Sequence, residues 1–187
     1  MAPPNLSAYR TYRRSIAGLP AGHGHARRPR PSVNETEFRQ ALSRLAAGTS
    51  IVTTFDQAGQ HLGLTATAVT ALSLDPPLVL VCVDKRARTA AALSAHAPFI
   101  IHFLSAGQAA LAIQFASPIP DKFAGVSYTL TASGCARLDG ALASVECAAY
   151  QVIPGGDHLI VIGRVVETQI GGEDAQPLVY FRSQFMH

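Results

Sequence analysis

The chain has 187 residues, of which 48% are apolar and 14% charged, and its formal net charge is +3. This length predicts one domain with a substantial core, and a charged fraction below the usual quarter predicts extensive burial, part of it against a second subunit. No apolar run approaches the roughly 18 residues of a membrane-spanning helix, so we expect no membrane span.

The predicted elements, taken in chain order, are mostly short strands. Residues 34–48 predict an amphipathic helix that Asn34 can cap. Its apolar face consists of Phe38, Ala41, Leu42 and Leu45. Further strands are predicted at 49–55, 61–74, 77–83, 98–104, 127–131, 134–139, 145–153 and 158–169, and further helices at 88–95 and 106–115.

Short turns between these strands, such as the hairpin turn at 154–157, predict mostly antiparallel pairing. Strands also outnumber crossover helices, which argues against a doubly wound parallel sheet. The expected fold class is therefore mainly β, a β-barrel with a few peripheral helices, over residues 32–187.

The basic excess is confined to residues 1–31, which hold six of the 15 Lys and Arg residues and no acid. The remainder then has nine basic and twelve acidic residues, a formal charge of −3, which argues against binding of nucleic acid by the domain. The tail is rich in Pro, Gly and Arg, so it is expected to be disordered. Arg13-Arg14 resembles a twin-arginine signal, but the apolar stretch required after it is missing, which favours a solvated tail.

The three cysteines, Cys82, Cys135 and Cys147, are far apart and form no CxxC pair. A zinc site or a disulfide framework is therefore not expected, and neither is another metal centre. Unpaired cysteines fit a reducing, cytoplasmic location.

Hydroxyl groups lie among small residues in the stretch GLTATAVTALS, at Thr65, Thr67, Thr70 and Ser73. Small side chains allow a ligand to approach the backbone and its N–H donors. The alternative is that threonine simply favours strands.

The segment from Asp84 to Thr89 follows an apolar strand and opens a predicted helix. Its three cations and hydroxyl at a helix N-terminus predict an anion site, although a solvated basic turn is the alternative. Together with the hydroxyl-rich stretch, it predicts a ligand with a polar ring at one end and a phosphate at the other.

These residues resemble the flavin-reductase-like family. The resemblance rests on Gly63-x-Thr65-Ala66-x-Ala68, Ser73 and Pro76-Pro77 before an apolar strand. Further matches follow in the family's order at residues 99–105, 115–116, 122–123, 156–158 and 177–182, so the resemblance covers roughly residues 36–183. It implies an FMN-binding split β-barrel, of the kind that serves as the NAD(P)H:flavin oxidoreductase of two-component flavin monooxygenases.

The resemblance also implies a set of cofactor-binding residues for FMN or FAD. Thr65, Ala66 and Thr67 would line the isoalloxazine edge, with Ser73 nearby. The ribityl chain and phosphate would be held by Asp84, Lys85, Arg88 and Thr89. His102, with Phe103, stands where relatives have Asn, and Asp84 also departs from the family pattern. Lys122 and Phe123 would border the flavin.

The catalytic position falls to His158, as a residue that positions the flavin and the incoming NADH or NADPH rather than as a lone acid or base. The alternative for His158 is a partly exposed residue at a hairpin end. Hydride transfer needs stacked rings at near-attack distance and no strong acid or base. The implied partners are a second copy of the chain in a homodimer and a flavin-dependent monooxygenase that receives reduced flavin.

Two other classes of function stay open from the sequence. One is a non-catalytic flavin- or haem-binding module, or a flavoprotein that passes electrons to another acceptor. The other is a structural subunit with a degenerate site, which the departures at Asp84 and His102 make conceivable.

Overall fold

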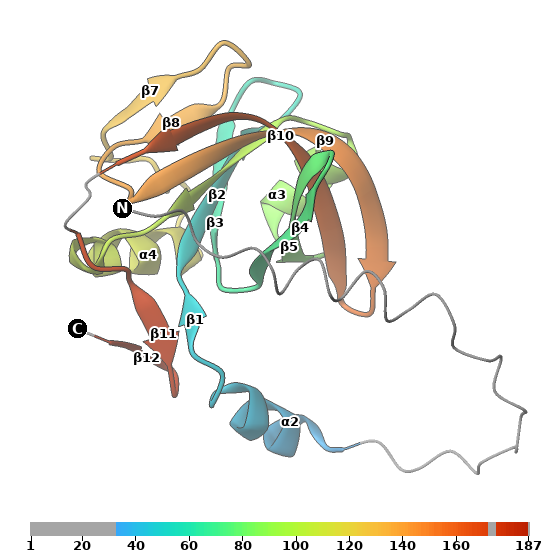
Figure 1. Cartoon of the computed structure of the whole chain (residues 1–187), viewed down its shortest axis with the longest axis vertical. Coiled ribbons are helices and arrows are strands. Elements are labelled where there is room, and N and C mark those ends of the chain that lie inside the picture. The colour runs from blue at the N-terminus through green and yellow to red at the C-terminus, as the bar shows by residue number, and fades with distance from the viewer. Residues whose placement is uncertain (1–32, 172–174, 187) are drawn as a thin grey trace, which may run out of the picture. The chain divides into compact units, whose positions relative to one another are not determined.

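The computed structural model of the chain describes residues 33–171 and 175–186; the predicted tail, residues 1–31, lies outside this part. Its main sheet has seven strands in the order β3-β2-β6-β9-β10-β5-β4, and all neighbours in it are antiparallel (Figure 1). The strands are β2 (Ser50–Phe55), β3 (His61–Ala66), β4 (Val69–Leu74), β5 (Pro77–Asp84), β6 (Phe99–Phe103), β9 (Ala143–Gly155) and β10 (His158–Ile170). The predicted mainly β architecture is confirmed.

The two edges of this sheet, β3 and β4, follow each other directly in the chain. Only Thr67 and Ala68 separate them, and the Cys82 N–H donates to the Ala68 carbonyl at 3.0 Å. A two-residue link therefore joins the two edge strands, which do not pair with each other. The single strand predicted over 61–74 was wrong in this respect, because the run TATAV has no Gly or Pro to mark the break.

The core lies on both faces of β2, because neighbouring residues of a strand point to opposite sides. Val52 joins a cluster with Val81, Val83, Phe99 and residues of α3 (Arg88–Ser94). On the other face, a second cluster consists of Ile51, Leu104, Ala112, Phe115, Leu138 and Leu178. The second cluster includes α4 (Ala109–Ala116), which follows the short 3-10 helix η1 (Ala106–Gln108).

The first helix differs from its prediction. It is α2 (Glu35–Leu42), shorter than the expected 34–48, and none of its residues is buried. Its predicted apolar face is exposed, with 54% of Phe38 and 49% of Leu42 accessible. Within the described residues, no helix combines the length and apolar character needed to cross a membrane.

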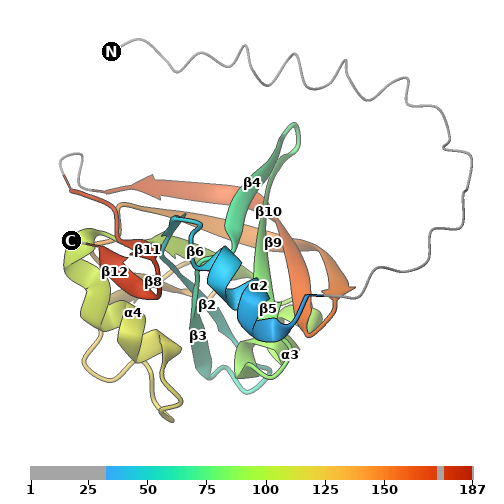
Figure 2. The same ribbon diagram turned by 90° about the horizontal axis from the view of Figure 1, so that it is seen from below.

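The remaining strands form two small sheets. β7 (Tyr128–Leu130) pairs with β8 (Ala136–Leu138), and β1 (Ala47–Gly48), β11 (Val179–Phe181) and β12 (Gln184–Met186) form the other. In both views β11 and β12 lie beside α4 (Figure 1 and Figure 2). The predicted β9–β10 hairpin is confirmed, with a tighter turn of Gly156 and Asp157 in which Gly156 has a φ of 64°.

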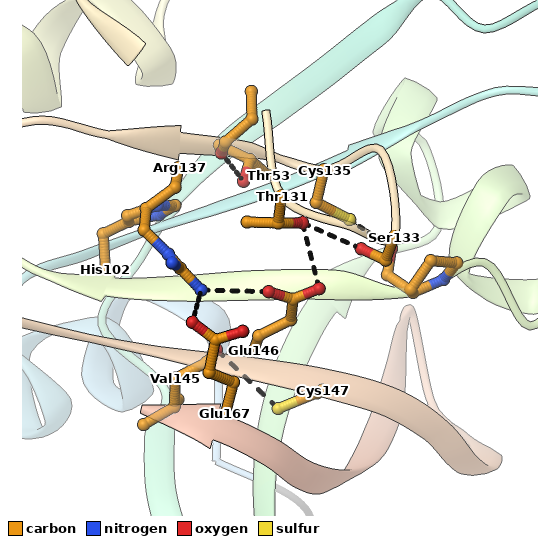
Figure 3. A network of polar contacts seen from close by, with 12 residues as sticks. Thr53, His102, Thr131, Ser133, Cys135, Arg137, Val145, Glu146, Cys147 and Glu167 are labelled. Atoms are coloured by element: carbon orange, nitrogen blue, oxygen red, sulfur yellow. Dashed lines mark hydrogen bonds and ion pairs between the residues drawn. The ribbon is translucent and has the colours of Figure 1, made fainter. Parts of the chain in front are cut away.

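A buried polar network attaches β8 to β9 and β10 (Figure 3). The Arg137 Nη2 atom lies 3.0 Å from Glu146 Oε2 and 2.8 Å from Glu167 Oε1. The Thr131 hydroxyl donates to the other Glu146 oxygen at 3.0 Å. Glu146 is only 4% exposed, so its charge depends on these partners.

His102, predicted from the sequence as a cofactor-binding residue, lies in the core. Its side chain is fully buried, and Leu138 N–H donates to Nε2 at 3.0 Å. The ring proton therefore lies on Nδ1, which donates to the Ile51 carbonyl at 3.1 Å. Burial, with a smaller effect from the nearby Arg137 charge, lowers the pKa of His102 to about 4, although the hydrogen bond with the Ile51 carbonyl acts in the opposite direction. The neutral ring joins β2, β6 and β8.

Candidate functional site

A pocket of about 900 Å³ opens beside β3, the end of β5, the start of α3 and residues 115–122. This volume is typical of small-molecule and cofactor sites. The structure brings eight of the predicted site residues to its wall: Thr65, Ala66, Thr67, Asp84, Arg88, Thr89, Lys122 and His158. These residues come from distant parts of the chain, so the fold assembles the set that the sequence suggested.

Five predicted residues do not line this pocket: Ser73, Lys85, His102, Phe103 and Phe123. Ser73 lies further along β4, opposite Leu78, and Phe103 packs against the core. His102 lies in the part of β6 that is buried on both faces, residues 99–102, and Phe103 is partly buried. The structure does not bring these five side chains to the pocket wall, and their predicted role in binding a cofactor stays a prediction.

Lys85 and Phe123 do not line the pocket but contact residues beside it. The Lys85 backbone N–H donates to the Asp157 carbonyl at 3.1 Å and its Nζ donates to the Gly156 carbonyl at 2.5 Å. These bonds tie the end of β5 to the β9–β10 turn. Phe123 packs edge-on against Phe115, with ring centroids 5.1 Å apart, and Phe115 itself lines the pocket.

The wall formed by residues 63–68 offers backbone atoms to a ligand. β3 is an edge strand, so its outer backbone groups have no strand partner among the described residues. The Thr65 hydroxyl donates to the Ala112 carbonyl of α4 at 2.6 Å. Gly63 lies so close to the Phe115 ring that a Cβ at this position would clash with it. The small residues thus keep both the edge strand and α4 close to the cavity.

One end of the pocket has two cations that form no ion pair with any described carboxylate. Arg88 Nη2 donates to the Gln60 amide oxygen at 2.8 Å, and Lys122 Nζ donates to the Phe115 carbonyl at 2.6 Å. Partial burial lowers the pKa of Lys122, and the nearby Arg88 charge lowers it further. Thr89 is 2% exposed, and its hydroxyl has no partner among the described residues. This end can bind an anion.

His158, the predicted catalytic residue, lies in the pocket wall at the start of β10. His158 Nδ1 lies 2.8 Å from Asp157 Oδ1, and 43% of the His158 side chain is exposed. His158 pairs with Asp84 in the β10–β5 register. The hydrogen bond and charge of His158 hold the pKa of Asp157 below its usual value. The ring is therefore oriented at the pocket wall by the residue that precedes it.

The Asp84 carboxylate pairs with Arg86, whereas the neighbouring Lys85 ammonium bonds the Gly156 carbonyl. The carboxylate accepts three hydrogen bonds from the Arg86 side chain, of which Nη2 to Oδ2 is the shortest at 2.6 Å. These bonds and the Arg86 backbone N–H hold the pKa of Asp84 far below its usual range. The Asp84 charge is thus paired within its own segment.

Sequence reasoning missed several wall residues, including Gln60, Cys82 and the loop Ser117, Pro118, Ile119, Pro120 and Asp121. The loop lies between residues 115–116 and 122–123, which both match the family pattern. This position was the one indication in the sequence that the loop belongs to the site. Gln60 had no signal, because it stands in a turn whose proximity to Arg88 depends on folding.

The comparisons with known proteins agree with this geometry. A family model described as a flavin reductase like domain matches residues 42–187. The chain is 38% identical over 135 residues to the stachydrine N-demethylase reductase subunit of Rhizobium meliloti, covering 72% of this chain and 59% of that relative. It thus spans less than two thirds of that relative's length.

Two other similar proteins are matched over most of their length. The reductase subunit of a flavin-dependent monooxygenase from Rhodococcus jostii is 36% identical over 154 residues, covering 82% of this chain and 78% of the relative. An NADH:FAD oxidoreductase from Streptomyces globisporus, solved with NAD and FAD fragments, superposes with a TM-score of 0.77 at 32% identity, covering 82% and 92% of the two chains. Because the family model spans nearly the whole described barrel, including every wall of the pocket, the chain belongs to the flavin reductase-like family.

Proposed function

We propose that the protein is an NAD(P)H-dependent flavin reductase that reduces FMN or FAD by hydride transfer. The observation that carries this proposal is the pocket, which has two cations without ion-pair partners at one end and the oriented His158 ring at its wall. A flavin nucleotide has the matching form, an extended polar ring joined to a phosphate. When bound, it would supply the electron-accepting ring, and the protein would supply orientation.

The residues present fit a phosphorylated flavin. The unpartnered Thr89 hydroxyl, Arg88 and Lys122 offer donors and charge for the phosphate. The backbone around Thr65 and Thr67 offers hydrogen-bonding groups for the polar ring edge. The Asp84–Arg86 pair is electrically neutral, so it does not repel the ribityl and phosphate end.

NADH or NADPH would bind against the exposed face of the bound flavin, near His158. The GxGxxG sequence of a dinucleotide-binding helix is absent from the chain. Hydride transfer therefore depends on stacking in one shared pocket rather than on a separate nucleotide domain. The similar oxidoreductase solved with NAD and FAD fragments supports this arrangement.

We further propose that the reduced flavin is passed to a partner monooxygenase. The two curated relatives described above bear names of reductase subunits, one of them of a flavin-dependent monooxygenase. The pocket is open, which suits a flavin that is released after reduction. Mixing the protein with NADH, flavin and a candidate oxygenase should restore hydroxylation; failure across candidates that accept chemically reduced flavin would contradict this role.

The decisive experiment for the reductase activity mixes purified protein with NADH or NADPH and FMN or FAD in all four pairings. Loss of the nicotinamide absorbance band at about 340 nm is expected with at least one pairing. If flavin binds but no nicotinamide is consumed, the protein is a flavin-binding module instead. Comparison of kcat/KM among the pairings assigns the preferred flavin and nicotinamide.

Replacing His158 with alanine should lower kcat with NADH on the order of tenfold, because the ring positions the two reactants at the pocket wall. The Kd of the flavin should change by less than about twofold, because the phosphate end is untouched. The matched control is Asp157→Asn, which keeps the turn and should give a smaller loss. Equal losses of kcat and flavin affinity with a lowered Tm would place His158 in the scaffold.

We also propose that a second copy of the chain covers the exposed edge strand β4. Leu72 and Leu74 of this strand are 46% and 72% exposed, and only 14% of the sequence is charged. Exposed apolar residues on an edge strand favour pairing with another chain. Sedimentation velocity should give the mass of two chains, and a monomer at micromolar concentration would contradict the homodimer.

A cytoplasmic location is part of the same proposal. All three cysteines are free, and burial raises the pKa of Cys135 and, to about 12, that of Cys147. Free cysteines of low reactivity are compatible with a reducing compartment such as the cytoplasm. Cell fractionation with an antibody to the chain checks this location, and recovery from an exported fraction would overturn it.

A further inference from the structure

Two arginines that are only two residues apart have different kinds of partner. Arg86 is bound to the carboxylate of Asp84, so the charge of this pair is close to zero. Arg88 is bound instead to the amide oxygen of Gln60, at 2.8 Å. An amide accepts the same hydrogen bond as a carboxylate but leaves the positive charge uncompensated. Both arginines line the pocket, and only Arg88 keeps its full charge there.

Gln60 itself is fixed by the turn between β2 and β3. Its backbone N–H donates to Asp56 Oδ1 at 2.9 Å, and its carbonyl accepts the Asp56 N–H at 3.0 Å. Asp56 Oδ1 also accepts the Ala58 N–H at 3.0 Å. The residue thus stands at the rigid start of β3, and its amide determines where the Arg88 guanidinium lies.

Among the residues that the structure describes, no carboxylate forms an ion pair with Arg88. Lys122 lies close enough for its pKa to be lowered by Arg88, so the two cations repel each other. The carboxylates in the wall are Asp84, which Arg86 holds, and Asp121, whose Oδ1 accepts the Phe123 N–H. A bound anion would relieve the repulsion.

We infer that Gln60 is a positioning residue that holds Arg88 for the phosphate of the flavin without neutralising it, and thereby sets the preference for phosphorylated flavins over riboflavin. The inference rests on the proposed flavin-binding function. In this inference Gln60 does not contact the phosphate itself. It acts through Arg88, which does.

The test measures the Kd of FMN and of riboflavin for the full-length protein without added nicotinamide, by quenching of flavin fluorescence. Gln60→Glu keeps the shape and hydrogen bond but pairs Arg88 with a carboxylate. It should weaken FMN binding about tenfold and change riboflavin binding by less than about twofold. Gln60→Met keeps the length and removes the acceptor, so it should lower the FMN-to-riboflavin preference by a smaller factor.

The variant Arg88→Ala separates this inference from the function on which it rests. If wild type binds no flavin, or if Arg88→Ala leaves the FMN-to-riboflavin ratio unchanged, the phosphate assignment itself is wrong. If Arg88→Ala abolishes the preference while both Gln60 variants retain it, the phosphate site stands and the role of Gln60 is refuted.

A further arm tests whether Gln60 acts through Arg88. In the Arg88→Ala background, Gln60→Met should cause no additional loss of preference, because there is no guanidinium left to hold. An equal loss in both backgrounds would overturn the inference. An unchanged Tm confirms that each variant is folded, and an affinity ratio between two flavins is insensitive to a general loosening of the barrel.

Discussion

Replacing Arg137 with alanine is expected to lower the free energy of unfolding by about 3–5 kcal/mol, the cost typical of breaking a buried ion pair. Glu146 is 4% exposed and would keep only its hydrogen bond from the Thr131 hydroxyl. A carboxylate left in such a place has lost its counter-charge without regaining water. Urea denaturation followed by circular dichroism measures the loss.

The matched control is Glu167→Gln, which removes the other carboxylate of the same network. The Glu167 side chain is 53% exposed, so its ion pair with Arg137 is largely solvated. A change of about 1 kcal/mol or less is expected. A double variant, Arg137→Met with Glu146→Leu, should recover part of the stability, because no buried charge remains. If Arg137→Ala costs no more than the control, Glu146 is hydrated and the network is not a structural element.

Acidification from pH 6.5 to about pH 4 is expected to remove about 3 kcal/mol of stability through His102 alone, with the folded-state pKa at about 4. The pKa is lower in the folded protein than in the unfolded chain, for which the ordinary value is 6.5. Between these values the unfolded state binds a proton that the folded state does not. The stability contributed by the neutral ring is therefore complete above pH 6.5 and is lost as the pH falls toward 4.

The measurement is the free energy of unfolding at half-unit pH steps for wild type and His102→Asn. The variant should have a flatter profile across this window, whatever its stability at neutral pH. Asp84 and Asp157, whose pKa values are lowered in the folded protein, add the same slope to both proteins at the acid end of the window, so the difference between the profiles reports on His102. Parallel profiles for the two proteins would mean that folding does not lower the pKa of His102.

The sequence predicted most strands, and part of the site, for a simple physical reason. Alternation and continuous apolar runs identify strands, and Thr65 to Thr67 and Asp84 to Thr89 lie in short continuous stretches. His102 shows where this fails. β6 is buried on both faces, so its pattern cannot distinguish a side chain that faces a ligand from one that joins two backbones.

The other misses have the same origin in contacts that only folding creates. Gln60 meets Arg88 across 28 positions of sequence, and nothing local marks either residue for the other. The apolar stripe of α2 predicted a buried helix, but burial requires a partner surface, and none of its side chains is buried in the described chain. Periodicity reports amphipathicity, not what covers the apolar side.

The two-residue link between β3 and β4 has a consequence for folding. Each of these edge strands first pairs with its neighbour in sequence, β2 or β5, through a short local turn. The β2–β3 and β4–β5 pairs can therefore form early. The two-residue link between them reaches its final position only when the strands of the whole sheet are in register. The pocket wall at Thr65 to Ala68 lies on this link. Under the proposed function, a flavin bound there would stabilise the completed sheet by mass action, so the proposed substrate would also favour the last step of folding.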